Sequence, residues 1–333
     1  MALNQRQFDV LTCLEKARCA MTQRELARQT GVSLGTINKT VTSLEALGCV
    51  DEAGITEHGL EALEPYRVRR AVFLAAGFGS RLVPVTLNTP KPLVRVKGTR
   101  MIDTMLDAVY AAGIEEVVVV RGYLGEQFDQ LLYKYPGIRF VENPLYNEAN
   151  NISSAFCARK LLQSAYVLEA DLVLYNQSLI TKYQYASNYL GVPVERTDDW
   201  CFEVKQGRIT HLGIGGQNCY HMFGVSYWSN EDGAKLAEHI KQVYEMIGNL
   251  RLDVQYTTSL VDLCNQVTRE CIDVTAYGAQ VFSDRFLVMS DAERLAETRK
   301  VLDDLDRLNS QVSYIDVQAK AIKYNSEMLN TYF

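Results

Sequence analysis

The chain has 333 residues, of which 47% are hydrophobic and 22% charged, and its formal net charge is −6. A chain of this length is expected to form about two domains and can bury a core without disulfides or a structural metal. The acidic balance excludes a protein that coats nucleic acid by bulk positive charge, and no apolar run approaches the roughly 18 residues of a membrane-spanning helix.

The cysteine pattern and the first residues indicate the compartment. The eight cysteines form no CxxC pair, and most lie among apolar residues. Residues 1–6 lack the basic-then-apolar pattern of a signal peptide. We therefore expect a cytoplasmic protein with reduced thiols and no membrane contact.

Residues 1–66 are predicted to form a small helical domain. Three helices are expected, of which the second and third begin at the capping residues Thr22 and Ser33. A stretch at 49–55 fits a two-stranded wing, and a further helix begins at Thr56. This order of elements resembles a winged helix-turn-helix domain.

The resemblance implies DNA binding through the third helix, but the charge of this domain argues for caution. Residues 1–65 contain six basic and nine acidic side chains. Few cations are therefore present for the phosphate contacts that supply most non-specific affinity. DNA is therefore a possible partner of this domain, but we do not favour DNA binding over docking to another protein or domain. If DNA does bind, the resemblance places five side chains in the major groove: Ser33, Thr36, Asn38, Lys39 and Thr40.

Strand and helix patterns alternate over residues 67–300, which predicts an α/β domain with a mostly parallel sheet between helices. Ligands of such sheets bind beyond the carboxyl ends of the strands. The predicted strands cover 70–76, 116–120, 139–141 and 165–169, and the predicted helices cover 101–112, 124–133 and 153–162.

A glycine-rich stretch directly follows the first predicted strand. Two glycines allow backbone N–H groups to approach a phosphate chain, and Arg81 and Lys91 add cations for it. A P-loop is excluded because Gly-Lys-Ser/Thr is absent, and a dinucleotide fingerprint is excluded because Leu82 occupies the third glycine position. The stretch reads Leu74, Ala75, Ala76, Gly77, Phe78, Gly79, Ser80 and Arg81.

At these residues the chain resembles the nucleotidyltransferases that activate sugar phosphates and alcohol phosphates, and most closely the bacterial CTP:phosphocholine cytidylyltransferases. The resemblance covers about 70–300 and implies a Rossmann-like nucleotidyltransferase fold. Further matching segments are Arg121–Phe128, Tyr146–Ser154, Glu169–Asp171, Asp199–Trp200 and Gly224–Trp228.

The resemblance also implies a role for each site residue. CTP would be attacked at its α-phosphorus, with Arg81 and Lys91 as the catalytic cations. Asp171 and Asp291 would hold Mg²⁺. The glycine-rich stretch would bind the nucleotide together with Tyr123, Asn151, Ser154 and Ala170, and the acceptor would contact Trp200, Tyr175 and Trp228.

Two departures from the family pattern leave alternatives open. Ser290 stands where a metal-binding aspartate is expected, with Asp291 one residue later. Thr257 and Thr258 replace an aromatic residue and an acid near the alcohol. Phosphocholine is the first candidate acceptor, with phosphoethanolamine and 2-aminoethylphosphonate as alternatives.

Two other functions also stay open, a protein of another class and a different nucleotidyltransferase. One is a nucleotide-sensing, DNA-binding regulator with a degenerate transferase domain. The other is a sugar-1-phosphate nucleotidyltransferase, which Asn150 and Asn151 disfavour because the sugar enzymes have Gly-Thr there. Residues 301–333 are predicted to form a helical tail that packs against the N-terminal domain or against a second subunit of a homodimer.

Overall fold

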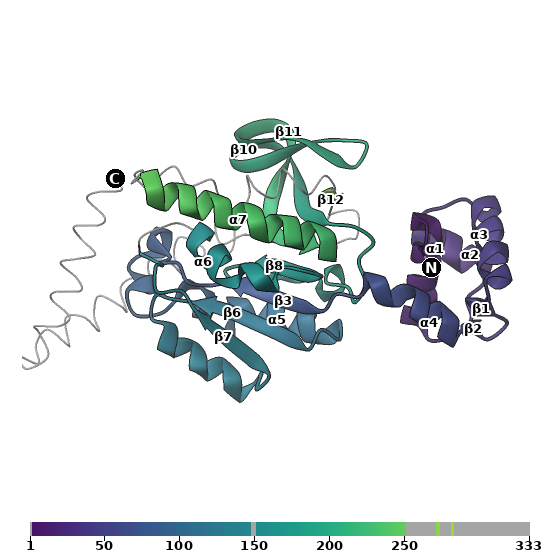
Figure 1. The fold of residues 1–333 in the computed structure, drawn as a ribbon, viewed down its shortest axis with the longest axis horizontal. Helices are drawn as coiled ribbons and strands as arrows, with labels where there is room; N and C mark the ends of the chain where they lie inside the picture. Colours follow the sequence, from purple (N-terminus) through teal and green to yellow (C-terminus); the bar gives the residue numbers. More distant parts are fainter. Residues whose placement is uncertain (1, 148–150, 251–270, 274–280, 283–333) are drawn as a thin grey trace, which may run out of the picture.

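The computed structural model describes residues 2–147, 151–250, 271–273 and 281–282 (Figure 1). The predicted tail at 301–333, the departures at Thr257, Thr258 and Ser290, and the predicted ligand Asp291 lie outside the described residues.

The N-terminal part forms the predicted helices and wing. Thr22 accepts a hydrogen bond from Glu25 N and Ser33 accepts one from Thr36 N, so both predicted N-caps are confirmed. Gly31 ends the second helix in the left-handed conformation, with φ 68°. The elements are α1 (Gln5–Ala17), α2 (Gln23–Thr30), α3 (Leu34–Ala46), β1 (Val50–Asp51), β2 (Gly54–Ile55) and α4 (Glu57–Leu63).

One residue that the DNA-binding prediction placed in the major groove is buried instead. Thr40 is 8% exposed, and its hydroxyl donates to Thr36 O at 2.9 Å. The spacing explains the difference, because residues three or four apart share a helix face and Thr40 lies between the buried Ile37 and Leu44. Asn38 and Lys39 remain exposed.

The larger part of the molecule is built on a seven-stranded sheet in the order β12-β10-β11-β8-β3-β6-β7. The four strands from β8 to β7 are parallel, whereas β11 runs antiparallel to β8 and to β10. This is the mixed, mostly parallel sheet that the sequence predicts. The strands are β3 (Arg70–Leu74), β6 (Glu116–Arg121), β7 (Ile138–Glu142), β8 (Ala165–Glu169), β10 (Asn188–Lys205), β11 (Arg208–Trp228) and β12 (Cys271–Asp273).

Helices cover both faces of this sheet (Figure 1). The helix α5 (Met101–Ala111) packs on the face that carries Phe73 and Val119. The helices α6 (Asn151–Ala158) and α7 (Asn230–Leu250) pack on the face of Val72 and Val118. Neighbouring residues of one strand point to opposite faces of the sheet. Because both faces are covered by helices, both sets of side chains are buried, and the strands are apolar without interruption.

The predicted helix at 124–133 is a 3₁₀-helix, η5 (Gly125–Tyr133), rather than an α-helix. Its buried residues Gly125, Phe128 and Leu131 repeat every three positions, which matches the three residues per turn of this helix type. The remaining short elements are β4 (Arg95–Val96), β5 (Thr99–Arg100), β9 (Val173–Leu174), β13 (Val281–Phe282), η1 (Glu64–Tyr66), η2 (Ser80–Leu82), η3 (Val85–Leu87), η4 (Lys91–Leu93), η6 (Arg159–Leu161) and η7 (Gln177–Leu179).

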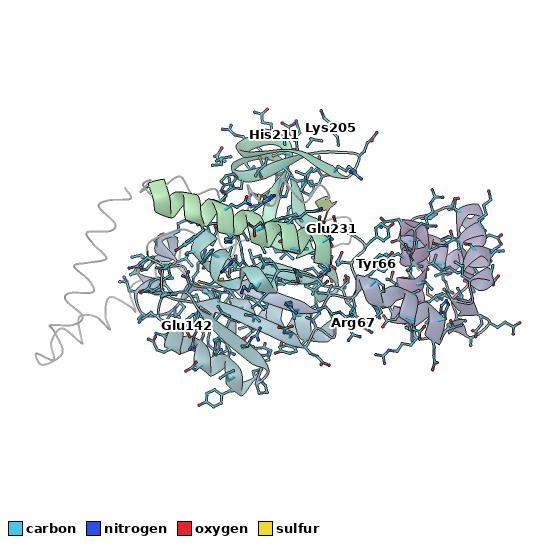
Figure 2. The ribbon with its side chains drawn as sticks, viewed as in Figure 1. Tyr66, Arg67, Glu142, Lys205, His211 and Glu231 are labelled. Atoms are coloured by element: carbon cyan, nitrogen blue, oxygen red, sulfur yellow. The ribbon has the colours of Figure 1, made fainter. Side chains whose placement is uncertain are left out.

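The two parts of the chain meet at a small aromatic junction. Tyr66 stacks on Tyr185 with ring centroids 5.6 Å apart, and Phe8 lies 5.2 Å from Tyr66. Glu15 accepts a hydrogen bond from Lys182 at 2.5 Å. Figure 2 shows Tyr66 and Arg67 at this junction, where we propose the domain boundary. In the described part of the chain, no helix is both long and apolar enough to cross a membrane.

Candidate active site

Three parallel strands present their carboxyl ends at one edge of the sheet, and backbone hydrogen bonds join the loops that follow them. Tyr123 N, after β6, donates to Ala76 O, after β3, at 3.1 Å. Ala170 N, after β8, donates to Leu74 O at 3.4 Å. The sequence-predicted residues Leu74, Ala76, Tyr123 and Ala170 are therefore brought together at this edge, and Ala75 N adds a bond of 2.9 Å to Val120 O.

The glycine-rich loop makes a close approach that only glycine allows. Gly79 has φ +64°, and a Cβ there would lie 2.9 Å from Lys91 Cβ and 3.0 Å from Thr86 Cγ2. Thr86 Oγ1 also donates to Gly79 O at 2.8 Å. A Cβ at Gly77 would meet no atom within 4 Å, so this residue faces open space. The loop is thus held closely on its Lys91 side and is open at Gly77.

An ion pair between two distant segments lies at the centre of this edge. Lys91 Nζ donates to Asp171 Oδ2 at 2.5 Å, although the residues are 80 positions apart in the chain. Lys91 is only 6% exposed. A cation that is this far removed from water keeps its charge only if an opposite charge is near, which Asp171 supplies. The sequence assigned both residues to one site, and the structure places them in contact.

The other cation and the tyrosine of the predicted site have different environments. Arg81 and Ser80 are exposed on η2. The hydroxyl of Tyr123 donates to Thr86 O and Leu87 O, both at 3.1 Å, so it holds the loop between η2 and η4. Burial, with a smaller contribution from Tyr146, raises the pKa of Tyr123, which favours the neutral phenol.

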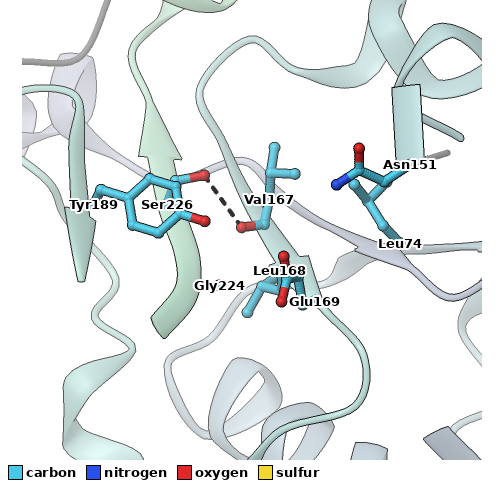
Figure 3. A pocket seen from close by; sticks show the side chains of 8 residues that line it. All are labelled: Leu74, Asn151, Val167, Leu168, Glu169, Tyr189, Gly224 and Ser226. Atoms are coloured by element: carbon cyan, nitrogen blue, oxygen red, sulfur yellow. Dashed lines mark hydrogen bonds between the residues drawn. The ribbon is translucent and has the colours of Figure 1, made fainter. Parts of the chain in front are cut away.

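A small pocket lies between the start of α6 and the strands β3, β8, β10 and β11 (Figure 3). Asn151, at the start of α6, is one of its lining residues. Glu169 and Tyr189 also line it, although the sequence reading gave neither a role. The signal for Glu169 was its place at a strand end, two residues before Asp171. The lining residues are Leu74, Asn151, Val167, Leu168, Glu169, Tyr189, Gly224 and Ser226.

The predicted acceptor residues are spread over the domain. Trp200 lies half-buried in β10 and packs against the apolar cluster that contains Tyr189. Tyr175 follows β9 and is 51% exposed. Trp228 is fully buried, and it pairs with Ala165 at the amino end of β8, whereas the site lies at the carboxyl end. The structure does not bring Trp228 to the site, because β11 runs antiparallel to β8.

Asp171 is the described residue that fits a magnesium ligand best. Asp171 lies two residues after the end of β8 and contacts Lys91, and its side chain is 27% exposed, so part of the carboxylate can reach a ligand. Within the described ranges no group of three or more His, Cys, Asp or Glu side chains is arranged for metal binding. Mg²⁺ often takes only one or two protein carboxylates and completes its shell with phosphate oxygens and water. Asp171 therefore fits as one protein ligand of a nucleotide-bound ion.

Comparisons with known proteins agree with this fold. The family model of a MobA-like NTP transferase domain matches residues 71–222, and that of a winged helix-turn-helix DNA-binding domain matches residues 3–51. A 2-aminoethylphosphonate cytidylyltransferase from Lancefieldella rimae is 40% identical over 186 residues, covering 55% of this chain and 76% of that protein.

Two further matches, one to a sequence and one to a solved structure, are to phosphocholine cytidylyltransferase from Streptococcus pneumoniae. A choline-phosphate cytidylyltransferase is 32% identical over 179 residues, covering 53% of this chain and 76% of that protein. A solved structure of a CTP:phosphocholine cytidylyltransferase matches with a TM-score of 0.59 at 27% identity, covering 72% of this chain and 99% of the other.

The fold and its polar edge therefore define a nucleotidyltransferase. The chain belongs to the MobA-like NTP transferase family, within which these relatives are cytidylyltransferases, and it carries an N-terminal winged helix-turn-helix domain. The family resemblance predicted from the sequence motifs is confirmed.

Proposed function

We propose that this protein transfers a cytidylyl group from CTP to a small phosphate or phosphonate that carries a positively charged amino group. The Lys91–Asp171 pair at the carboxyl edge of the sheet is the observation that carries this proposal. It combines a buried cation for a phosphate with a carboxylate for a metal, next to a loop of exposed glycine backbone. The names of the cytidylyltransferase relatives support CTP as the donor.

The chemistry is a single displacement at the α-phosphorus of CTP. An oxygen of the acceptor's phosphate or phosphonate forms the new P–O bond, the bond to the β-phosphate oxygen breaks, and pyrophosphate leaves. Lys91 neutralises the charge on the α-phosphate, and Arg81 holds the pyrophosphate. The backbone of Ala76–Gly79 binds the triphosphate. Catalysis of this kind depends mainly on positioning and electrostatic stabilisation.

Magnesium is part of the proposal. Asp171 would hold it, and the ion would supply further positive charge to the phosphate oxygens when bound. The contact between Lys91 and Asp171 supports this proposal, because a cation for the phosphate and a carboxylate for the ion are adjacent. Asp171→Asn is expected to abolish magnesium-dependent turnover, because it removes the proposed carboxylate ligand.

The acceptor differs between the relatives. The 40% identity to a 2-aminoethylphosphonate enzyme supports a phosphonate with a primary amine. The 32% identity to a choline-phosphate enzyme, together with the half-buried Trp200, supports a quaternary amine on a phosphate. We propose 2-aminoethylphosphonate as the first acceptor to test, with phosphocholine and phosphoethanolamine beside it.

A panel of nucleoside triphosphates and acceptors, read by pyrophosphate release with magnesium present, tests the proposal. Release is expected with CTP and one of the three amino compounds. Glucose 1-phosphate with UTP or dTTP is the control for a sugar nucleotidyltransferase. If no pair releases pyrophosphate, the proposed function is wrong.

The winged-helix domain supports a second proposal, which is DNA binding. A family model for DNA-binding winged helices matches it, and α3 lies on the side of this domain that is far from the transferase domain (Figure 1). Arg24, Arg28 and Lys39 are the basic residues of α2 and α3. Binding to operator fragments, released by CTP and without turnover, would favour a regulator over an enzyme.

A further inference from the structure

The loop that links β7 to α6 is anchored by one buried side chain, that of Asn143. Asn143 is the first residue after β7, and its backbone N–H donates to Arg121 O at 2.8 Å, which extends the pairing of β6 with β7. The residue is only 2% exposed. The sequence motifs gave it no role.

The amide of Asn143 uses both of its ends. Nδ2 donates to Ser153 Oγ at 2.9 Å and to Ser154 Oγ at 3.1 Å. Oδ1 accepts from Leu145 N at 3.0 Å and from Cys157 Sγ at 3.8 Å. A backbone N–H can only donate, so the bond from Leu145 fixes which end of the amide is the oxygen. The side chain therefore ties the start of the loop to the first two turns of α6.

Both ends of the tied segment touch the proposed nucleotide site. The ring of Tyr146 lies 5.3 Å from that of Phe78 in the glycine-rich loop. A Cβ on Gly122 would be 2.7 Å from Tyr146 Cβ, so the backbone after β6 also packs closely on this ring. At the other end, Asn151 lines the pocket (Figure 3).

We propose that Asn143 is a positioning residue for CTP, which sets the places of Tyr146 and Asn151 relative to the glycine-rich loop. The inference rests on the proposed function, and it assigns to Asn143 an effect on CTP binding that requires no contact with the nucleotide. The Ser154 hydroxyl, which the sequence predicts to contact the nucleotide, also accepts a hydrogen bond from Asn143, so this residue is held in place by the same anchor.

The test compares Asn143→Ala with a matched control, Asn188→Ala. Asn188 is equally buried at 3% exposed, and its Nδ2 donates to Gln184 Oε1 and Ala186 O at 2.8 and 2.9 Å. The equilibrium constant for CTP binding is measured without acceptor, followed by kcat and the two KM values. Losing buried hydrogen-bond partners typically weakens an interaction by about tenfold or more.

For Asn143→Ala we expect CTP to bind about tenfold more weakly, while the KM of the acceptor and kcat at saturating CTP stay within about threefold. Asn188→Ala should leave CTP binding unchanged. A purely structural role would lower the melting temperatures of both variants without separating their CTP affinities, and that outcome overturns the proposal.

Hydrogen exchange of the wild-type protein gives a test that does not depend on a variant that folds. The amide of Leu145, which donates to Asn143, should exchange more slowly when CTP is bound. CTP binding without any change at Leu145 contradicts the inference. Absence of both CTP binding and turnover in the wild-type protein would instead refute the proposed function.

Discussion

The helix caps of the winged-helix domain and the carboxyl edge of the transferase sheet use polar side chains over very different distances along the chain. In the winged-helix domain the capping bonds join near neighbours, such as Thr22 with Glu25 and Ser33 with Thr36. At the sheet edge the polar contacts span long stretches of chain. Lys91 meets Asp171 80 positions away, and Tyr123 reaches Thr86 37 positions away.

This difference separates two kinds of polar group. A side chain that bonds three residues away stabilises one helix end, and its removal should be felt locally. A side chain that bonds to a distant segment ties the fold together where the chemistry is proposed, so its removal should be felt in turnover. The following substitutions test that contrast.

The largest effect is expected from Lys91→Ala. Removing one charge-stabilising group from a site of this kind typically costs about 10²–10³ in rate. The change also leaves Asp171 without its counter-charge. Turnover is followed by pyrophosphate release and folding by circular dichroism, with the exposed Lys160→Ala as control. Near-wild-type turnover would show that Lys91 is not part of the site.

A smaller loss is expected from Gly79→Ala. Its Cβ would lie 2.9 Å from Lys91 Cβ, at a backbone φ of +64° that disfavours alanine. The matched control is Gly113→Ala, where φ is +75° but no atom lies within 4 Å of the new Cβ. Both should lose about 1–2 kcal/mol of stability from the backbone, and only Gly79→Ala should lose turnover. Equal turnover in the two variants would show that the close packing of Gly79 against Lys91 does not matter for catalysis.

Thr22→Ala tests the local side of the contrast. Losing an N-cap hydroxyl typically costs about 1 kcal/mol. Denaturant unfolding should show this loss in the winged-helix domain, and turnover should not change. Thr42→Ala, an exposed threonine within α3, serves as the control. A drop in turnover for Thr22→Ala would show that the two domains are coupled.

The smallest effect is expected at the junction of the domains. The side chains of Glu15 and Lys182 are 21% and 32% exposed, and such pairs usually contribute up to about 1 kcal/mol. A double-mutant cycle of Glu15→Gln and Lys182→Met measures the coupling, which should fall as salt is added. A coupling energy above about 1 kcal/mol, or one that does not change with salt, would show that Glu15 and Lys182 do not behave as a partly exposed ion pair.

The same pair has a pH dependence with a definite sign. Burial is the largest single influence and opposes the charge of Lys182, but the hydrogen bond and charge attraction of Glu15, with smaller contributions from Tyr183, together outweigh it and raise the pKa of the lysine. A raised lysine pKa stabilises the folded state below the unfolded value, and the stabilisation is lost as pH rises through the folded pKa. The coupling should therefore persist at neutral pH and disappear in strongly alkaline solution, where Lys182 loses its charge.

The amino-acid sequence by itself determined the local features of this protein. The caps at Thr22 and Ser33, the parallel strands and the glycine-rich stretch follow from spacing and residue type, because each depends on a few neighbouring residues. The motif resemblance was likewise sufficient to predict the transferase family.

The tertiary structure decided everything that depends on distant pairing. The antiparallel course of β11 removes Trp228 from the site, and helix packing buries Thr40. The contact of Lys91 with Asp171 and the anchoring of α6 by Asn143 arise only when separate strands end side by side. A sequence pattern records which residues are near in the chain, whereas burial and hydrogen-bond partners depend on segments that only folding brings together.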